Sequence, residues 1–190
     1  SSRMGRDKAF LKFGEKTIVE NLTSLLISLF EETFVIVREK TKFESLNLGP
    51  AKIYEDFITG RGPLAGIYTA LSYSKNPACA VFTCDMPLID SSFVGELVEF
   101  WEEDFDVLAI ENGEGRLEPF PGVYSRSSRH LMRLLLDRNE ASMHRFLEAS
   151  VVKKLILQEK RIRILTNMNT IEDYDTVLKE KEEHFGGIGA

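Results

Sequence analysis

The sequence predicts an α/β protein with a three-layer α/β/α Rossmann-like fold and a mainly parallel sheet. Short apolar or β-branched runs alternate along the chain with amphipathic segments, which is typical of parallel strands covered by helices on both sides. Residues 79–84 (CAVFTC) are almost continuously apolar, as expected of a strand buried on both faces. The chain of 190 residues is long enough for one complete core and has no Pro/Gly/Ser-rich linker, so residues 1–190 are expected to form a single domain.

Each element follows from its local pattern. Apolar residues that recur on one helix face predict the helices, and β-branched runs bounded by turn residues predict the strands. The expected strands are residues 33–37, 51–54, 79–84, 106–110 and 161–166. The expected helices are residues 18–29, 64–73, 91–103, 127–137, 140–149 and 170 onward, the last with a capping-box-like start. We interpret the lysine-rich stretch within residues 152–163 as an exposed sheet edge.

Composition limits the partners and the compartment. The net charge of −6 argues against general binding to nucleic acid or to a membrane surface. No apolar run approaches the roughly 20 residues needed to cross a bilayer. Cys79 and Cys84 are expected to point to opposite faces of one strand and cannot bridge, which suits a reducing, cytoplasmic location. A polyanionic ligand therefore requires a local cationic patch, and the opening run SSRMGRDK supplies one.

The glycine-rich turn after the strand at 51–54 is one candidate site. Ligands of such sheets bind beyond the carboxyl ends of the strands, which gives residues just after a strand functional weight. Gly60, Gly62 and Gly66 are spaced one residue too widely for the dinucleotide fingerprint, and the sequence contains no P-loop. Gly62 and Pro63 suit a turn into a helix whose free N–H groups bind a phosphate or a base edge. A purely structural tight turn explains the glycines equally well.

Two further segments follow strands. Asp85 comes directly after the apolar strand, where a carboxylate suits Mg²⁺ held jointly with substrate phosphates; the alternative is a turn or N-cap aspartate. Asn167 and Asn169 follow the last expected strand, where their amides would orient a ligand or metal, or Asn169 would cap the next helix.

The opening stretch SSRMGRDKAFLKFGEKTIVENL resembles the start of the molybdenum cofactor guanylyltransferases, the MobA family within the nucleotidyltransferases. The resemblance continues through Asp56, GPLAG (residues 62–66), CDMP (84–87), PGVY (121–124) and NMNTIEDY (167–174), and so spans the chain in order. GPLAG, CDMP and NMNT at these separations are its most specific parts. In this family a first strand and a Gly-Gly pair precede the serines, so we expect both upstream of Ser1. Arg38 stands where the family often has an asparagine after its second strand.

The resemblance implies Mg²⁺-dependent transfer of GMP from GTP to the terminal phosphate of molybdopterin, with release of pyrophosphate. It gives Lys8, Arg3 and Asp85 the catalytic roles: Lys8 and Arg3 on the phosphates, and Asp85 on the metal. It implies nucleotide binding by Ser1, Arg3, Lys8, Asp56, Gly62, Pro63, Leu64 and Asp85. Asn167 and Asn169 would contact molybdopterin. Molybdoenzymes or other cofactor-biosynthesis proteins are the expected protein partners.

Two kinds of alternative remain open from the sequence. A related enzyme would use CTP with the same pterin, or would act on a sugar 1-phosphate. A non-catalytic GTP-binding module would bind GTP without releasing pyrophosphate.

Overall fold

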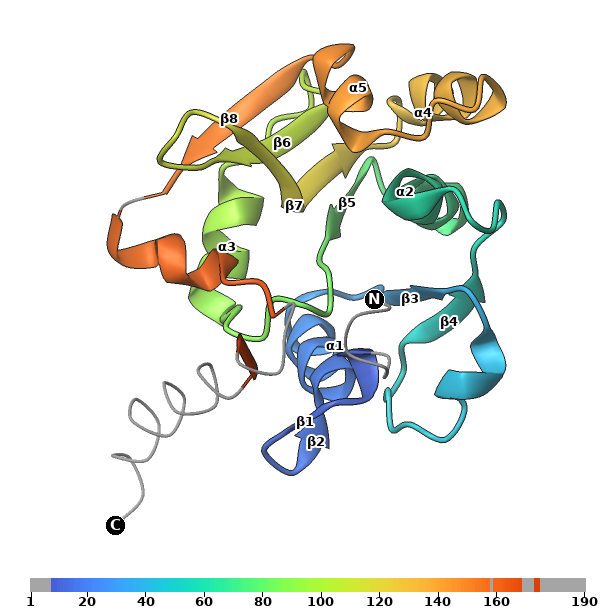
Figure 1. Cartoon of the computed structure of the whole chain (residues 1–190), viewed down its shortest axis with the longest axis vertical. Coiled ribbons are helices and arrows are strands. Elements are labelled where there is room, and N and C mark those ends of the chain that lie inside the picture. The colour runs from blue at the N-terminus through green and yellow to red at the C-terminus, as the bar shows by residue number, and fades with distance from the viewer. Residues whose placement is uncertain (1–7, 158, 169–172, 175–190) are drawn as a thin grey trace.

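The computed structural model describes residues 8–157, 159–168 and 173–174. The α-helices are α1 (Ile18–Leu29), α2 (Gly62–Tyr73), α3 (Ser91–Glu99), α4 (Arg129–Asp137) and α5 (Met143–Glu148). The 3₁₀ helices are η1 (Lys8–Phe10), η2 (Lys40–Phe43) and η3 (Glu159–Leu165). The strands are β1 (Lys12–Phe13), β2 (Lys16–Thr17), β3 (Phe34–Val37), β4 (Lys52–Glu55), β5 (Ala78–Val81), β6 (Val107–Glu111), β7 (Leu117–Ser125) and β8 (Val152–Ile156). Figure 1 shows their arrangement.

The main strands form two separate sheets. β3 and β4 make a parallel pair, and the other sheet has the strand order β5-β7-β6-β8. β7 is antiparallel to both β5 and β6, whereas β8 is parallel to β6. β5, β6 and β8 therefore share one direction, as expected of the mainly parallel sheet that the sequence predicts, and β7 is inserted antiparallel between β5 and β6. The small β1–β2 hairpin precedes α1.

Helices cover both faces of the larger sheet, which confirms the three layers. All residues of β6 except its last are buried, and they alternate between the two sides. Val107 and Ala109 pack in a core cluster with α2, α4 and α5. Leu108 and Ile110 pack in a second cluster with α3, against which side chains of α1 also pack. Burial on both faces explains why this strand is apolar at successive positions rather than at alternate ones.

The sequence does not predict β7. Pro119 and Pro121 lie inside it, and proline cannot donate to the hydrogen-bond ladder of a central strand. The structure accommodates them in an irregularity: the β6–β7 register shifts between Leu108 and Ile110. Gly122 lies in the same stretch, where an added Cβ would stand 2.8 Å from the carbonyl oxygen of Leu108.

The expected strand at 161–166 is wrong. Those residues lie mostly in η3, and the edge position beside β6 is filled by β8. β8 is an edge strand and carries Lys153 and Lys154, which confirms the edge interpretation for the first part of that stretch. The helix expected from residue 170 falls largely outside the described residues. Among the described residues, no helix is long and apolar enough to cross a membrane.

Candidate functional site

The carboxyl ends of β3 and β4 bring two charged residues to the same edge. The strands pair in register from Phe34 with Lys52 to Val37 with Glu55, so Arg38 and Asp56 leave the sheet side by side. The backbone N–H of Asp56 donates to the carbonyl oxygen of Val37 at 2.8 Å, which extends the pairing by one residue. This edge is where ligands of parallel sheets bind.

The Asp56 carboxylate is oriented by α2. Its Oδ1 accepts hydrogen bonds from the Ile58 backbone N–H at 3.1 Å and from the Thr69 hydroxyl at 3.0 Å. The Thr69 hydroxyl in turn accepts from the Phe57 N–H at 3.1 Å, and Thr69 is fully buried. The hydrogen bonds that the described residues make to this carboxylate all use Oδ1. Thr69 is a supporting residue that the sequence analysis missed, because a threonine within a helix carries no motif.

The glycine-rich turn leads into α2 as expected. Gly60 and Gly62 adopt φ values of +78° and +67°, which favour glycine. Pro63 occupies the first turn of α2, and the N-cap residue Arg61 makes no side-chain capping bond. The first N–H groups of α2 therefore receive no side-chain cap from Arg61, and such groups suit an anion. Leu64 is fully buried, so only its backbone is positioned to meet a ligand.

Asp85 lies on a loop whose conformation is set by two contacts. β5 ends at Val81, so three residues separate it from Asp85, which is half-buried. The Thr83 hydroxyl donates to Asp85 Oδ1 at 2.5 Å and orients the carboxylate. The Met168 N–H donates to the Asp85 carbonyl oxygen at 2.8 Å. Because Asn167 adjoins Met168, this bond brings Asn167, which is exposed, beside the Asp85 loop.

Lys8 approaches the same region from the start of the described chain. It opens η1, and the next residue, Ala9, is buried. Ala9, Arg38 and Cys84 all line one cavity, so Lys8 and Asp85 are each one residue away from a wall of that cavity. Arg38, which is exposed, adds a cation that the sequence analysis did not place in the site. Ser1, Arg3 and Asn169 lie outside the described residues.

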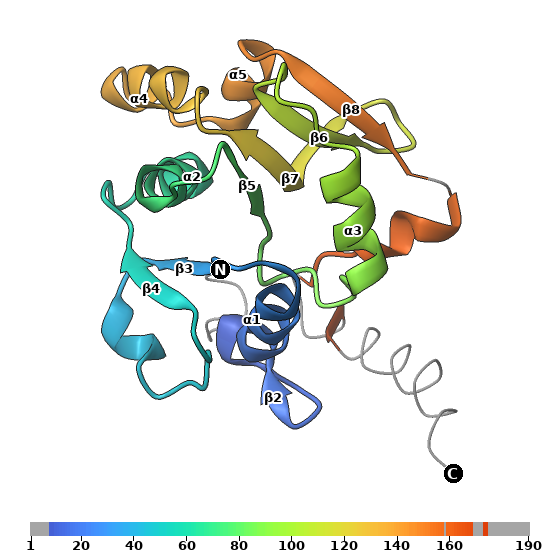
Figure 2. The same cartoon turned by 180° about the vertical axis from the view of Figure 1, so that it is seen from behind.

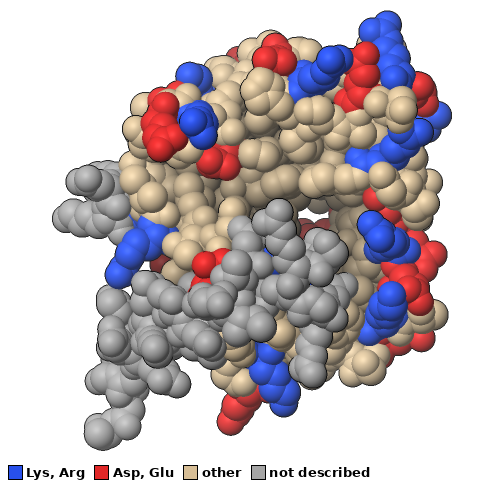
Figure 3. Space-filling view, in the orientation of Figure 1, with Lys and Arg blue, Asp and Glu red and all other residues tan. Residues whose placement is uncertain are grey.

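This cavity is part of a slot between β3 and β5. Two cavities of about 510 and 520 Å³ share the lining residues Leu26, Thr33, Phe34, Ile36, Phe82 and Thr83. Among the described strands, β3 pairs with β4 alone and β5 with β7 alone, and residues of both β3 and β5 line the slot. The two sheets stand apart in both views of the ribbon (Figures 1 and 2), and the surface is hollowed between them (Figure 3). The buried Thr33 hydroxyl has no hydrogen-bond partner among the described residues.

The donor set suits a hard cation shared with a ligand. Among the described residues, no three His, Cys, Asp or Glu side chains gather as a metal site. Mg²⁺ commonly takes only one or two carboxylates and completes its shell with phosphate oxygens and water. The half-buried carboxylate of Asp85, held by Thr83, fits that requirement.

A three-layer α/β fold with acids, cations and a helix N-terminus near the carboxyl ends of its strands is the arrangement typical of nucleotide-binding α/β proteins. Two solved structures share this fold. One is the molybdopterin-guanine dinucleotide biosynthesis protein A from Archaeoglobus fulgidus, at a TM-score of 0.80 and 23% identity over 98% of this chain and 94% of that one. Another is the 2-C-methyl-D-erythritol 4-phosphate cytidylyltransferase from Thermus thermophilus, at a TM-score of 0.70 and 18% identity over 92% and 94%.

The chain belongs to the MobA-like NTP transferase domain family, whose model matches residues 1–155. Among its relatives is a probable molybdenum cofactor guanylyltransferase from Clostridium perfringens, 33% identical over 192 residues, or 96% of this chain and 93% of the relative. Another protein of that description, from Carboxydothermus hydrogenoformans, is 33% identical over 94% of this chain and 90% of its own. The resemblance stated from the sequence motifs is thereby confirmed, and the chain is a nucleotidyltransferase.

Proposed function

We propose that this protein transfers GMP from GTP to molybdopterin in the cytoplasm, with release of pyrophosphate, and that Mg²⁺ is required. The observation that carries this proposal is the meeting of the Asp85 loop with the Asn167–Met168 segment, one residue away from a cavity that Ala9 and Arg38 also line. This contact brings the Asp85 loop, expected to bind the metal, next to the Asn167 segment, expected to bind the acceptor. The shared cavity adds the start of η1, where Lys8 is expected to bind the phosphates. The names of the relatives, which share about a third of the sequence, support guanine and molybdopterin as the substrates.

The residues would act by position and charge. The terminal phosphate of the acceptor attacks the α-phosphorus in line, and negative charge on the phosphate oxygens has to be neutralised. Lys8 and Arg3 would bind the phosphates of GTP, and Lys8 would offset charge on the pentavalent transition state. Asp85 would hold Mg²⁺, which when bound supplies further positive charge to those oxygens. No side-chain nucleophile is needed, because the acceptor phosphate is already anionic.

The remaining residues would bind the two substrates. Asp56, Ser1 and the turn formed by Gly62, Pro63 and Leu64 would contact the nucleotide, with Leu64 contributing through its main chain alone. Asn167 and Asn169 would contact molybdopterin. Molybdoenzymes or other cofactor-biosynthesis proteins would take the product from this site.

The test is pyrophosphate release with GTP, molybdopterin and Mg²⁺, using Asp85→Asn beside the unchanged protein. We expect kcat to fall about 100-fold or more, because the charge that holds the metal is lost while the side-chain shape is kept. Asp137→Asn is the matched control, since Asp137 is an exposed carboxylate paired with Arg133 on α4 and away from this edge. Mg²⁺-dependent turnover at the original rate in Asp85→Asn contradicts the assigned role. Product formed with CTP and not GTP contradicts the guanine assignment.

We also propose that residues 1–190 belong to one domain whose slot holds a further β-strand, supplied by sequence on the amino-terminal side of Ser1. The second edges of β3 and β5 support it, because no other described strand pairs with them, and backbone groups in the interior of a sheet need partners. α1 side chains and α2 side chains both line the slot, so the strand is expected to be apolar on both faces. Ala9 and Arg38 line the same cavity, and Ala9 packs in one cluster with Val37 at the end of β3, which suits a strand parallel to β3 that continues into η1.

An amino-terminal extension tests this strand. Five β-branched apolar residues followed by Gly-Gly and fused to Ser1 should slow amide exchange in β3 and β5 and raise Tm. The same extension with proline at its centre is the control, because proline removes the donor that the sheet requires. Equal exchange with both extensions contradicts the proposal. The proposal is also contradicted if the protein without an extension already shows slow exchange in β3 and β5, and if that exchange becomes slower as the protein concentration rises. That result would assign the slot to a second copy of the chain.

A further inference from the structure

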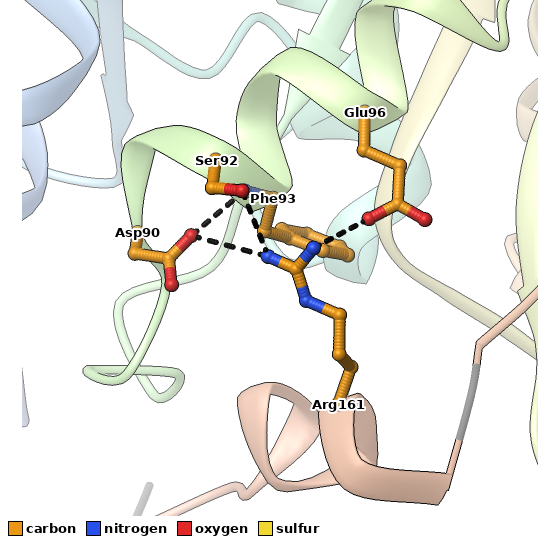
Figure 4. A network of polar contacts seen from close by, with 5 residues as sticks. All are labelled: Asp90, Ser92, Phe93, Glu96 and Arg161. Atoms are coloured by element: carbon orange, nitrogen blue, oxygen red, sulfur yellow. Dashed lines mark hydrogen bonds and ion pairs between the residues drawn. The ribbon is translucent and has the colours of Figure 1, made fainter.

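Arg161 connects two parts of the chain that are distant in sequence. It extends from η3 toward the first turns of α3 (Figure 4). Its guanidinium donates to Glu96 Oε2 at 2.8 Å and to Ser92 Oγ at 3.2 Å, and lies 3.6 Å from Asp90 Oδ1. We call these contacts the Arg161 bridge. Two carboxylates and a hydroxyl around one planar fork are a set that arginine binds and lysine cannot reproduce.

The partners on α3 are themselves fixed. Asp90 is the N-cap of α3, and its Oδ1 accepts from the Phe93 N–H at 2.7 Å. Phe93 is fully buried in the core cluster of α3. The side chain of Arg161 is 30% exposed, so the ion pairs are partly shielded from water and less screened than surface pairs. The bridge therefore attaches η3 to a rigid element.

Both ends of the bridge lead directly to the Asp85 loop. Asp90 follows Asp85 by five residues along the chain. On the other side, η3 runs into the segment that ends at Met168, whose N–H bonds to the Asp85 carbonyl oxygen. Met168 is also fully buried with Phe13 and Ile18. The Arg161 bridge and the hydrogen bond from Met168 to Asp85 thus connect the same two segments of the chain, residues 85–96 and 161–168, at two points.

We infer that Arg161 is a positioning residue for the transfer reaction: it holds η3 and Asn167 against the Asp85 loop without touching a substrate. This inference rests on the proposed function for its catalytic part. Without the bridge, the segment before Met168 loses its charged attachment to α3, and the carbonyl contact at Asp85 opens more often. The metal carboxylate then spends less time in its working position, so Mg²⁺ binds less well while nucleotide binding elsewhere is unchanged.

Exchange of the Met168 amide tests the structural part by itself. In Arg161→Met we expect this amide to exchange about tenfold faster, the effect of losing charge-assisted hydrogen bonds of ordinary strength. Arg133→Met is the matched control, since Arg133 also pairs with a carboxylate, Asp137, but on the exposed face of α4. Unchanged exchange in Arg161→Met, or equal acceleration in both variants, contradicts the inference.

Kinetics test the catalytic part. The Mg²⁺ concentration for half-maximal pyrophosphate release should rise about tenfold in Arg161→Met, with KM for GTP at saturating Mg²⁺ within about twofold. Arg161→Lys should restore only part of the loss. An unchanged Mg²⁺ dependence overturns the positioning role even if exchange is faster. If the unchanged protein releases no pyrophosphate, the proposed function fails, and the exchange of Met168 alone decides whether Arg161 holds the loop.

Discussion

Thr69→Val tests whether a helix residue remote in sequence orients the Asp56 carboxylate. Valine has nearly the shape of threonine but removes the hydroxyl that donates to Asp56 Oδ1 and accepts from the Phe57 N–H. Because the two side chains are so similar in shape, the substitution leaves the packing around this fully buried residue almost unchanged. The change therefore isolates the two hydrogen bonds.

The expected loss of stability is about 2 kcal/mol, from two hydrogen bonds at roughly 1 kcal/mol each. Asp56 is half-buried and Phe57 is exposed, so water replaces part of what is lost and larger penalties for fully buried groups do not apply. For a chain of this length, Tm should fall by about 4–8 °C. The second effect is functional: a carboxylate that is free to rotate should raise KM for GTP about threefold to tenfold.

Thr69→Ser is the matched variant, because it keeps the hydroxyl and loses one buried methyl group. That loss costs about 1 kcal/mol, so its Tm should also fall. Its KM for GTP should stay near the original value. Thermal melting together with pyrophosphate-release kinetics on the two variants separates packing from orientation. The reasoning is refuted if the valine and serine variants have the same KM, or if the valine variant is as stable as the original protein.

Two further substitutions test the fold. Glu20 caps α1 with Thr17, and hydrogen bonds from Thr17 and from the Asn47 N–H lower its pKa below the ordinary 4.5. The ionised Glu20 carboxylate therefore contributes its full stabilisation above the ordinary pKa of 4.5, and this stabilisation is lost as the pH falls through the lowered pKa of the folded protein. Glu20→Gln should reduce the free energy of unfolding by about 1 kcal/mol at pH 7 and by less at about pH 3. Equal costs at both pH values, measured by urea unfolding, would contradict this. Gly122→Ala should cost about 2–3 kcal/mol, because the new Cβ would stand 2.8 Å from the Leu108 carbonyl oxygen, whereas Gly113→Ala, with nothing within 4 Å, should be nearly neutral. Similar melting temperatures for the two alanine variants would show that β7 can shift.

Local sequence patterns predict an element correctly where a single segment contains both its conformational preference and the apolar pattern of its buried face. The predicted helix at 18–29 matches α1, and the apolar run at 106–110 matches β6 to within one residue at each end. The predicted strand at 79–84 was too long, because residues 82–84 leave the sheet to line the slot. Asp56, Asp85 and Asn167 are candidates from the sequence because each follows an expected strand or lies in a family motif.

Elements that depend on a distant partner were missed or misassigned. β7 contains two prolines, and it is a strand because it pairs with β5 on one side and with β6 on the other, where the register is irregular. Residues 161–166 alternate like a strand, but β8 already pairs with β6, and Arg161 binds α3 instead.

The sequence by itself determined the layer architecture and the family, and it supplied the candidate site residues, because periodicity, turn chemistry and short motifs are properties of neighbouring residues. Only the tertiary structure decided which of those residues meet. Thr69 contacts Asp56 because α2 packs against the loop that precedes it, and Met168 contacts Asp85 from a distant part of the chain. Such contacts are set by the packing of whole helices and strands against one another, and no local pattern encodes that packing.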